Sequence, residues 1–180
     1  MKRLLSLVCA FGLTASPALA ALPTGAAAPA FGTKGALAGK DFTFNLKSAL
    51  ARGPVVLYFY PKAFTQGCTL EAHAFAEAMP DFRAAGAQVV GLSADDLPTL
   101  RRFSTEACRD AFPVAIATPA MIKAYDVALK RDGANTGVTD RTSYVIGRNG
   151  RVVMVHSDLD WRQHVKLTLA AVKALKAKTK

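Results

Sequence analysis

The sequence PVVLYFYPKAFTQGCTLEAHAF, residues 54–75, contains the strongest strand pattern of the chain and its most informative cysteine, Cys68. The first seven residues form a continuous β-branched and aromatic run, which predicts a strand buried on both faces. Helical spacing begins at Cys68, because the apolar residues that follow recur at intervals that place them on one helix face. The segment therefore predicts a buried strand, a short loop and a helix that carries Cys68 in its first turn.

Strand-like and helix-like segments alternate along the rest of the chain. Further strands are predicted at residues 87–92 and 112–117, and Asn149-Gly150 predicts the turn of a hairpin near the C-terminus. The remaining predicted segments are hairpin strands at 142–146 and 151–156 and helices at 93–109, 119–125 and 160–178. This order predicts an α/β protein with a central mixed β-sheet flanked by helices, and it resembles the thioredoxin fold.

The chain divides into a leader, an extended segment and one domain. Residues 1–20 combine a basic start, an apolar run and a small-residue cleavage site, which predicts a secretory signal peptide. The apolar run is shorter than the roughly 20 residues of a transmembrane helix. Residues 21–40, rich in Ala, Gly and Pro, predict an extended N-terminal segment that leads into a domain at 41–180. We expect an exported, periplasmic protein without stable membrane anchoring.

The formal charge of +10 comes from lysines and arginines that are scattered along the chain and gather mainly in the last predicted helix. No aromatic residues interleave with them there. A solvated basic surface explains this pattern, and we expect no nucleic-acid partner.

Three cysteines are present, and Cys9 would leave with the signal peptide. Cys68 and Cys108 would then meet an oxidising compartment, in which two thiols can form a disulfide. The pair could be a permanent structural bridge or a bridge that forms and breaks.

The surroundings predicted for Cys68 suit a reactive sulfur. The first N–H groups of a helix lack intrahelical partners and the helix dipole is positive there, so a thiolate is stabilised. Gly67 allows close approach of a small ligand, Pro61 ends the strand, and Thr65 brings a hydroxyl to within three positions of the sulfur. Spacing alone leaves a reactive cysteine and a buried structural one equally open.

Residues 61–68, PKAFTQGC, match the Pro-x-x-x-Thr-x-x-Cys motif of the peroxiredoxins (AhpC/TSA superfamily). The flanks FYPK and GCTLEA are similar to the branch of bacterioferritin-comigratory protein and PrxQ. Residues 141–146, RTSYVI, resemble the late strand of that family, which begins with an active-site arginine, and residues 112–114, FPV, resemble its Phe-Pro segment. The resemblance covers most of the chain after residue 29 and implies a thioredoxin-like fold.

The resemblance implies a thiol-dependent peroxidase that reduces hydrogen peroxide and organic hydroperoxides. Cys68 would attack the peroxide and become a sulfenic acid, and Thr65 would hydrogen-bond peroxide and sulfur. Arg141 would stabilise the thiolate and orient the peroxide, while Glu71 would orient Arg141. Pro61 would shield the sulfur from water. The chemistry implies no metal and no organic cofactor.

The chain departs from the resembled pattern after the nucleophile. Many members carry a resolving cysteine five positions later, where this chain has His73. We therefore expect Cys108 to resolve Cys68 through an intramolecular disulfide, after local unwinding that brings the Cα atoms to roughly 4.4–6.8 Å. Otherwise an external thiol must resolve it. His156 and His164 lack metal-ligand spacing, and we interpret both as structural.

The expected partners are a peroxide substrate and a thiol reductant, either a thioredoxin-like protein or a small thiol, and the chain could be a monomer or a homodimer. Two other functions are considered. A thioredoxin-like disulfide oxidoreductase would use Cys-x-x-Cys, and Glu71 at the second cysteine position argues against it. A non-enzymatic role, as a stably bridged protein or a redox sensor, is the other alternative.

Overall fold

The computed structural model describes residues 21–177, so the expected signal peptide at residues 1–20 lies outside the described residues. Seven strands form one mixed sheet in the order β2-β1-β5-β4-β3-β8-β9, and β6 and β7 form a separate two-stranded sheet. The strands are β1 (Gly32–Leu37), β2 (Lys40–Asn45), β3 (Val55–Phe59), β4 (Gln88–Ser93), β5 (Val114–Ile116), β6 (Ala128–Arg131), β7 (Ala134–Thr139), β8 (Thr142–Ile146) and β9 (Val152–Ser157). The helices are α1 (Leu46–Arg52), α2 (Gln66–Ala84), α3 (Leu97–Glu106), α4 (Pro119–Ala124), η1 (Trp161–Gln163) and α5 (His164–Ala177).

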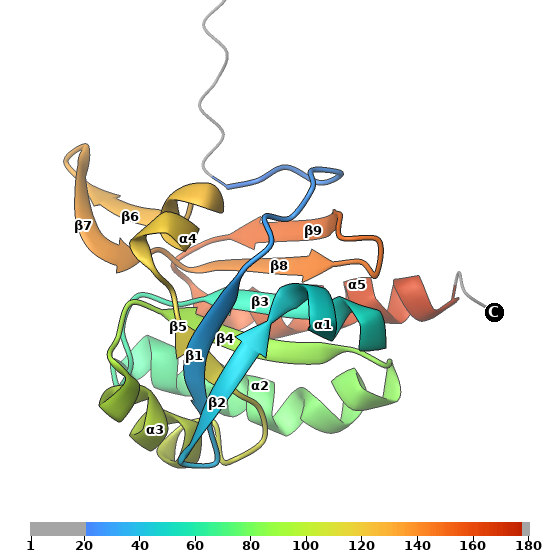
Figure 1. Cartoon of the computed structure of the whole chain (residues 1–180), viewed down its shortest axis with the longest axis horizontal. Helices are drawn as coiled ribbons and strands as arrows, with labels where there is room; N and C mark the ends of the chain where they lie inside the picture. The colour runs from blue at the N-terminus through green and yellow to red at the C-terminus, as the bar shows by residue number, and fades with distance from the viewer. Residues whose placement is uncertain (1–20, 178–180) are drawn as a thin grey trace, which may run out of the picture.

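The predicted buried run forms β3 at the centre of the sheet, parallel to β4 and antiparallel to β8. Every residue of β3 is buried. Alternate residues of a strand point to opposite faces, so Val56 and Tyr58 pack under α2, α3 and α5, while Val55 and Leu57 pack under α1 and α4. Figure 1 shows these helices arranged around the central sheet. The prediction of a thioredoxin-like α/β fold with a mixed sheet is confirmed.

The N-terminal segment contributes a strand to the main sheet. Residues 32–37, expected to be part of an extended segment ahead of the domain, form β1, which lies inside the main sheet between β2 and β5. The Ala- and Gly-rich composition conceals this strand. At Gly35 a Cβ atom would come within 2.1 Å of the Val114 carbonyl oxygen, so the close approach of β1 to β5 requires glycine.

Two further differences concern helix continuity and a hairpin. Helix α2 continues through Pro80 to Ala84, although the proline could have interrupted it. The β6–β7 hairpin, which turns at Asp132-Gly133, was not predicted, although Asp-Gly is a turn signal. β7 is mostly exposed and β6 has no buried residue, so neither strand shows the apolar alternation that identifies a half-buried strand.

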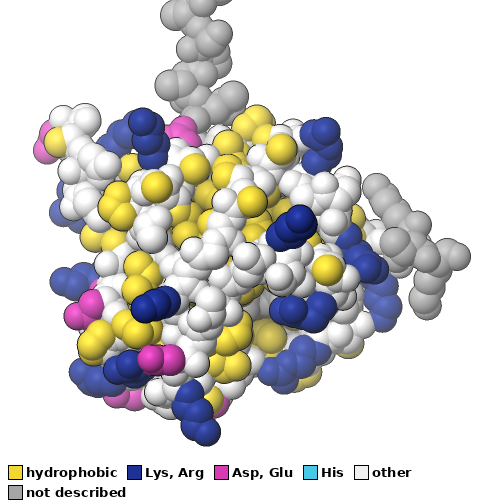
Figure 2. Space-filling model, in the orientation of Figure 1, with side chains coloured by type: hydrophobic (Ala, Val, Ile, Leu, Met, Phe, Trp, Pro, Cys, Tyr) yellow, Lys and Arg dark blue, Asp and Glu magenta, His cyan; other side chains and the backbone are white. Residues whose placement is uncertain are grey.

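The basic side chains do not form a single patch on the face shown in Figure 2, where lysines and arginines lie apart among apolar and neutral groups. This distribution agrees with the expected solvated surface. Among residues 21–177, no helix combines the length and the apolar character needed to cross a bilayer.

Candidate active site

Cys68 is the third residue of α2, and its side chain is only 1% exposed. Thr65 is the N-cap of the helix, and the N–H of Thr69 donates to its carbonyl at 2.9 Å. The backbone N–H groups of the first three helical residues therefore precede the helical hydrogen-bond ladder. The positive end of the helix lies at the buried sulfur, as the sequence predicts.

The loop before Cys68 is fixed to the end of β4. The N–H of Ala63 donates to Oδ2 of Asp95 at 2.8 Å, and the hydroxyl of Ser93 donates to the same oxygen at 2.8 Å. Phe64 adopts a left-handed backbone conformation, φ 63°, and its ring packs edge-on against Phe103 at 5.2 Å between centroids. These contacts define where the first turn of α2 begins.

Arg141 is the centre of the site, and its side chain is 6% exposed. Its Nε donates to the carbonyl of Leu159 at 2.8 Å, its Nη1 donates to Oε2 of Glu71, and its Nη2 lies 3.5 Å from Sγ of Cys68. A Cβ at Gly67 would lie 3.3 Å from Nη2, so a larger residue there would crowd the guanidinium. The structure thus brings Arg141, which lies between β7 and β8, together with Cys68 and Glu71 on α2.

The buried charges of this cluster influence one another. Burial raises the pKa of Glu71 to about 8, although Arg141 opposes this rise. Burial acts to lower the pKa of Arg141, but the negative charges of Glu71 and Cys68 outweigh it and raise that pKa above its usual value. Arg141 therefore remains a cation while it contacts two acidic groups, Glu71 and Cys68.

His164 extends the cluster, which the interpretation of this residue as structural did not foresee. The ring is fully buried, its Nε2 lies 2.9 Å from the carbonyl oxygen of Asp158, and its Nδ1 lies 2.8 Å from Oγ of Ser143. Nδ1 also lies 3.7 Å from Oε1 of Glu71. No sequence pattern signals this contact, because α5 and α2 meet only in the folded chain.

Thr65 and Pro61 lie in the loop that precedes Cys68. The Thr65 hydroxyl donates to the carbonyl of Lys62 at 3.0 Å, and the Thr65 side chain is exposed. Its oxygen therefore keeps lone pairs that can accept a hydrogen bond from a bound molecule. Pro61 directly follows β3 and is half-buried. Their expected roles stay predictions.

Cys108 lies in the turn that follows α3 and is fully buried. Burial raises the pKa of its thiol strongly, and the nearby charge of Asp110 adds to this effect. The hydroxyl of Tyr58 faces the thiol without completing a normal hydrogen bond. Cys68 and Cys108 are both free thiols in this structure, although they belong to one hydrophobic cluster.

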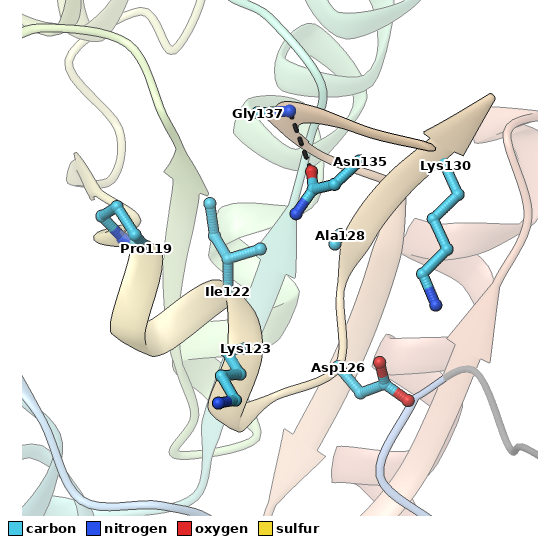
Figure 3. A pocket seen from close by; sticks show the side chains of 8 residues that line it. All are labelled: Pro119, Ile122, Lys123, Asp126, Ala128, Lys130, Asn135 and Gly137. Atoms are coloured by element: carbon cyan, nitrogen blue, oxygen red, sulfur yellow. Dashed lines mark hydrogen bonds between the residues drawn. The ribbon is translucent and has the colours of Figure 1, made fainter. Parts of the chain in front are cut away.

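Two hollows of the surface adjoin the β6–β7 hairpin, and Cys68 lines neither of them. Figure 3 shows one between α4 and the β6–β7 hairpin, lined by Ile122, Lys123 and Asn135, among others. A second is lined in part by β6 and reaches Arg141 and Leu159. Within residues 21–177 there is no group of three or more His, Cys, Asp or Glu side chains that could hold a metal ion.

Comparisons with known proteins identify the family of the chain. Residues 24–155 match the model of the AhpC/TSA family. The peroxiredoxin Bcp of Xanthomonas campestris is 32% identical over 146 residues, which cover 73% of this chain and 91% of that protein. The crystal structure of peroxidoxin BcpB from Mycobacterium tuberculosis superposes with a TM-score of 0.74 at 30% identity, covering 84% of this chain and 97% of that one.

A structure of the Xanthomonas campestris bacterioferritin comigratory protein, studied for its alkyl peroxide reduction activity, superposes with a TM-score of 0.69 at 30% identity. It covers 79% of this chain and 91% of its own. The family match extends over most of the chain and includes Cys68 and Arg141. The chain belongs to the AhpC/TSA family and is a peroxiredoxin.

Proposed function

We propose that Cys68 is the peroxidatic nucleophile of this thiol-dependent peroxidase. The observation that carries the proposal is the position of Arg141, whose Nη2 lies 3.5 Å from Sγ in a buried site at a helix N-terminus. A cation there stabilises a buried thiolate, which is the nucleophilic form of cysteine. Mutation of either residue to a neutral side chain tests the pairing, because each change should slow the oxidation of Cys68 by peroxide.

The reaction follows from this arrangement. The thiolate of Cys68 attacks the terminal oxygen of a hydroperoxide, the S–O bond forms as the O–O bond breaks, and the sulfur is oxidised by two electrons to a sulfenic acid. The leaving oxygen takes up one proton and departs as water or an alcohol. Arg141 stabilises the negative charge as it moves from sulfur to the leaving oxygen. Thr65, at the helix start, would hold the peroxide, and Pro61 would keep water from the sulfur.

We propose that organic hydroperoxides are substrates as well as hydrogen peroxide. Phe64, in the loop before Cys68, and Leu159, whose carbonyl holds Arg141, both expose their apolar side chains, at 40% and 60%. Such side chains can bury the alkyl group of a substrate. Comparison of cumene hydroperoxide with hydrogen peroxide in Phe64→Ser and Leu159→Ser tests this, because only the organic substrate should lose rate. Equal losses would contradict it.

We propose further that Cys108 resolves the sulfenic acid by attacking the sulfur of Cys68 and releasing water. Both thiols are buried in the same hydrophobic cluster, and the hydroxyl of Tyr58 lies near both. A disulfide brings the two Cα atoms to roughly 4.4–6.8 Å, and we expect the first turn of α2 to unwind so that the bond can form. Mass spectrometry after one equivalent of peroxide tests this step. A loss of two hydrogens that maps to both cysteines supports it, and a persistent added oxygen on Cys68 contradicts it.

The reductant and the location of the protein are also proposals. A thioredoxin-like protein or a small thiol would reduce the disulfide, and the protein would act as a monomer or a homodimer in the periplasm after removal of residues 1–20. The composition of residues 1–20 supports export. N-terminal sequencing of the protein from a periplasmic fraction tests it: a mature start at Ala21 supports export, and an intact Met1 contradicts it.

A further inference from the structure

The active-site cluster contains one permanent cation and more than one acid. Arg141 donates to Glu71 through one terminal nitrogen and approaches Cys68 through the other. If Glu71 and Cys68 were both ionised, this buried cluster would carry an uncompensated negative charge, which is costly in an apolar interior. A proton on or beside Glu71 removes that excess negative charge. The positive charge of Arg141 then compensates the thiolate of Cys68.

The hydrogen bonds of His164 define which of its nitrogens is available. The carbonyl of Asp158 can only accept, so Nε2, 2.9 Å away, must carry a proton. In a neutral ring Nδ1 is then an acceptor with a single lone pair, which either the Ser143 hydroxyl, 2.8 Å away, or a protonated Glu71 can fill. This leaves Nδ1 beside Oε1 of Glu71, a fully buried oxygen without a hydrogen-bond partner among the described residues.

Two acceptors facing each other at 3.7 Å in a buried site are explained when a proton lies between them. We propose that Glu71 and His164 form a pair that holds one proton at neutral pH, and that this proton lets Arg141 stabilise the thiolate of Cys68. The proposal rests on the peroxidase function stated above and makes His164 a positioning residue that acts through Glu71. A closer approach of about 1 Å would complete the hydrogen bond.

The ionisation tendencies of the pair agree with a proton on the Glu71 side. Burial raises the pKa of Glu71 to about 8. Burial, together with His156 and Arg141, lowers the pKa of His164 to about 4, although the Asp158 carbonyl opposes this shift. The other ionisable groups whose charges reach the pair are Cys68 on α2, Tyr58 on β3, Arg141 before β8, His156 on β9, and Asp158 and Asp160 in the following loop.

The pair also supplies the proton that the reaction consumes. Once the S–O bond has formed, the sulfur no longer carries a negative charge, and Glu71 can ionise and take Arg141 as its partner. The balanced step converts a protonated Glu71, a Cys68 thiolate and a hydroperoxide into a Glu71 carboxylate, a Cys68 sulfenic acid and an alcohol or water. Disulfide formation with Cys108 afterwards releases water and leaves the proton count unchanged.

Proton stoichiometry tests the proposal. The protein is mixed with one equivalent of hydrogen peroxide at pH 7 in weak buffer with a pH-indicator dye, and Trp161, the single tryptophan, reports the oxidation by its fluorescence. Its ring lies within 3.8 Å of a Cβ placed at Gly67, next to the reacting sulfur. Ultraviolet absorbance of the thiolate, assigned by comparison with Cys68→Ser, shows whether Cys68 is ionised before peroxide is added.

Glu71→Gln keeps the shape of a protonated Glu71 but has no proton to give. Glu77→Gln, an exposed change on the same helix, is the control.

We expect a thiolate in the wild type and in both variants. Oxidation should take up almost no proton from solution in the wild type and in Glu77→Gln, and one proton per sulfur in Glu71→Gln. A second measurement needs only the wild-type protein. Its proton uptake per oxidised sulfur should rise toward one as the pH passes about 8, where Glu71 loses its proton. This measurement stands even if Glu71→Gln does not fold.

Two results would overturn the pair: uptake of one proton by the wild type at pH 7, or the absence of a thiolate at that pH in a protein that still reacts. Failure of Cys68 to react with peroxide at all would overturn the proposed function as well. Infrared difference spectra give an independent readout, because oxidation of the wild type should remove a protonated-carboxyl band that Glu71→Gln lacks.

Discussion

The two cysteines of the described chain differ in their charged neighbours far more than in their burial. Cys68 is 1% exposed and Cys108 is fully buried, and both belong to one core cluster. Cys68 lies at a helix N-terminus beside the guanidinium of Arg141, whereas Cys108 lies in a turn that faces Tyr58. Burial by itself disfavours a thiolate, so a positive partner is what separates a reactive buried sulfur from an inert one.

Removal of each sulfur in turn gives the largest expected difference. Cys68→Ser should lower peroxide reduction at least about 1,000-fold, because the remaining thiol, Cys108, is buried without a positive partner that would stabilise its thiolate. Cys108→Ser should leave the first oxidation of Cys68 within about threefold, because that thiol is absent from the attack step. Stopped-flow fluorescence of Trp161 with one equivalent of peroxide measures both rates. An equal loss of the first oxidation in the two variants would erase the distinction between the cysteines.

Replacement of the positive partner should make Cys68 resemble Cys108. Arg141→Met should slow the oxidation of Cys68 about 100-fold, because it removes the charge that stabilises the thiolate and the leaving oxygen. Arg141→Lys should recover part of this rate, because it restores a charge but not the three-way hydrogen bonding to Leu159, Glu71 and the sulfur. The exposed Arg162→Met is the matched control and should react at the wild-type rate.

Alkylation compares the two thiols in one molecule. Burial raises the pKa of Cys108, so its thiolate is scarce at neutral pH. Iodoacetamide at pH 7 should therefore modify Cys108 at least about 10-fold more slowly than Cys68 in the folded, reduced protein. Peptide mass spectrometry over time measures the two rates, with the urea-unfolded chain as the reference in which they converge. Faster labelling of Cys108 in the folded protein would reverse the comparison.

The surroundings of Cys68 should also respond to pH in a way that those of Cys108 do not. The pKa of His164 falls to about 4 in the folded protein, so the unfolded chain binds more protons between pH 6.5 and 4. This stabilising contribution is complete above pH 6.5 and is lost as the pH falls, by about 1–2 kcal/mol at pH 5. Urea unfolding of wild type and His164→Gln at pH 7 and pH 5 should show this loss in the wild type alone.

The pKa of Glu71 shifts in the opposite direction, but Glu71 is present in both proteins, so the difference between them isolates His164. Equal pH dependence in the two proteins would show that this imidazole titrates normally.

Local patterns predicted most of the fold. The apolar run of β3, the Asn149-Gly150 turn and the spacing of α5 each carry their own signal, and each element formed near its expected position. β1 was missed because its pairing depends on Gly35, which appears unstructured by composition but allows the approach to β5. Strand pairing of this kind is a long-range property that a local window does not contain.

The active site likewise contains residues that a local sequence pattern identifies and groups that only the tertiary structure brings in. Pro61, Thr65, Cys68 and Glu71 occur within 11 consecutive residues, so a motif can identify them, and the late strand indicates Arg141. His164 and the Leu159 carbonyl have no such signal. They join the site because the turn after β9 and the start of α5 fold back onto α2, and only the tertiary structure brings them there.

The position of Ala21 has a practical consequence for work with the protein. Its side chain is 7% exposed, the next N–H donates to the hydroxyl of Tyr144, and Gly25 and Ala28 donate to carbonyls of the β8–β9 hairpin region. Affinity tags and protease sites should therefore end before residue 21. Trimming even a few residues further would strip partners from a buried tyrosine and loosen the hairpin that Arg141 precedes.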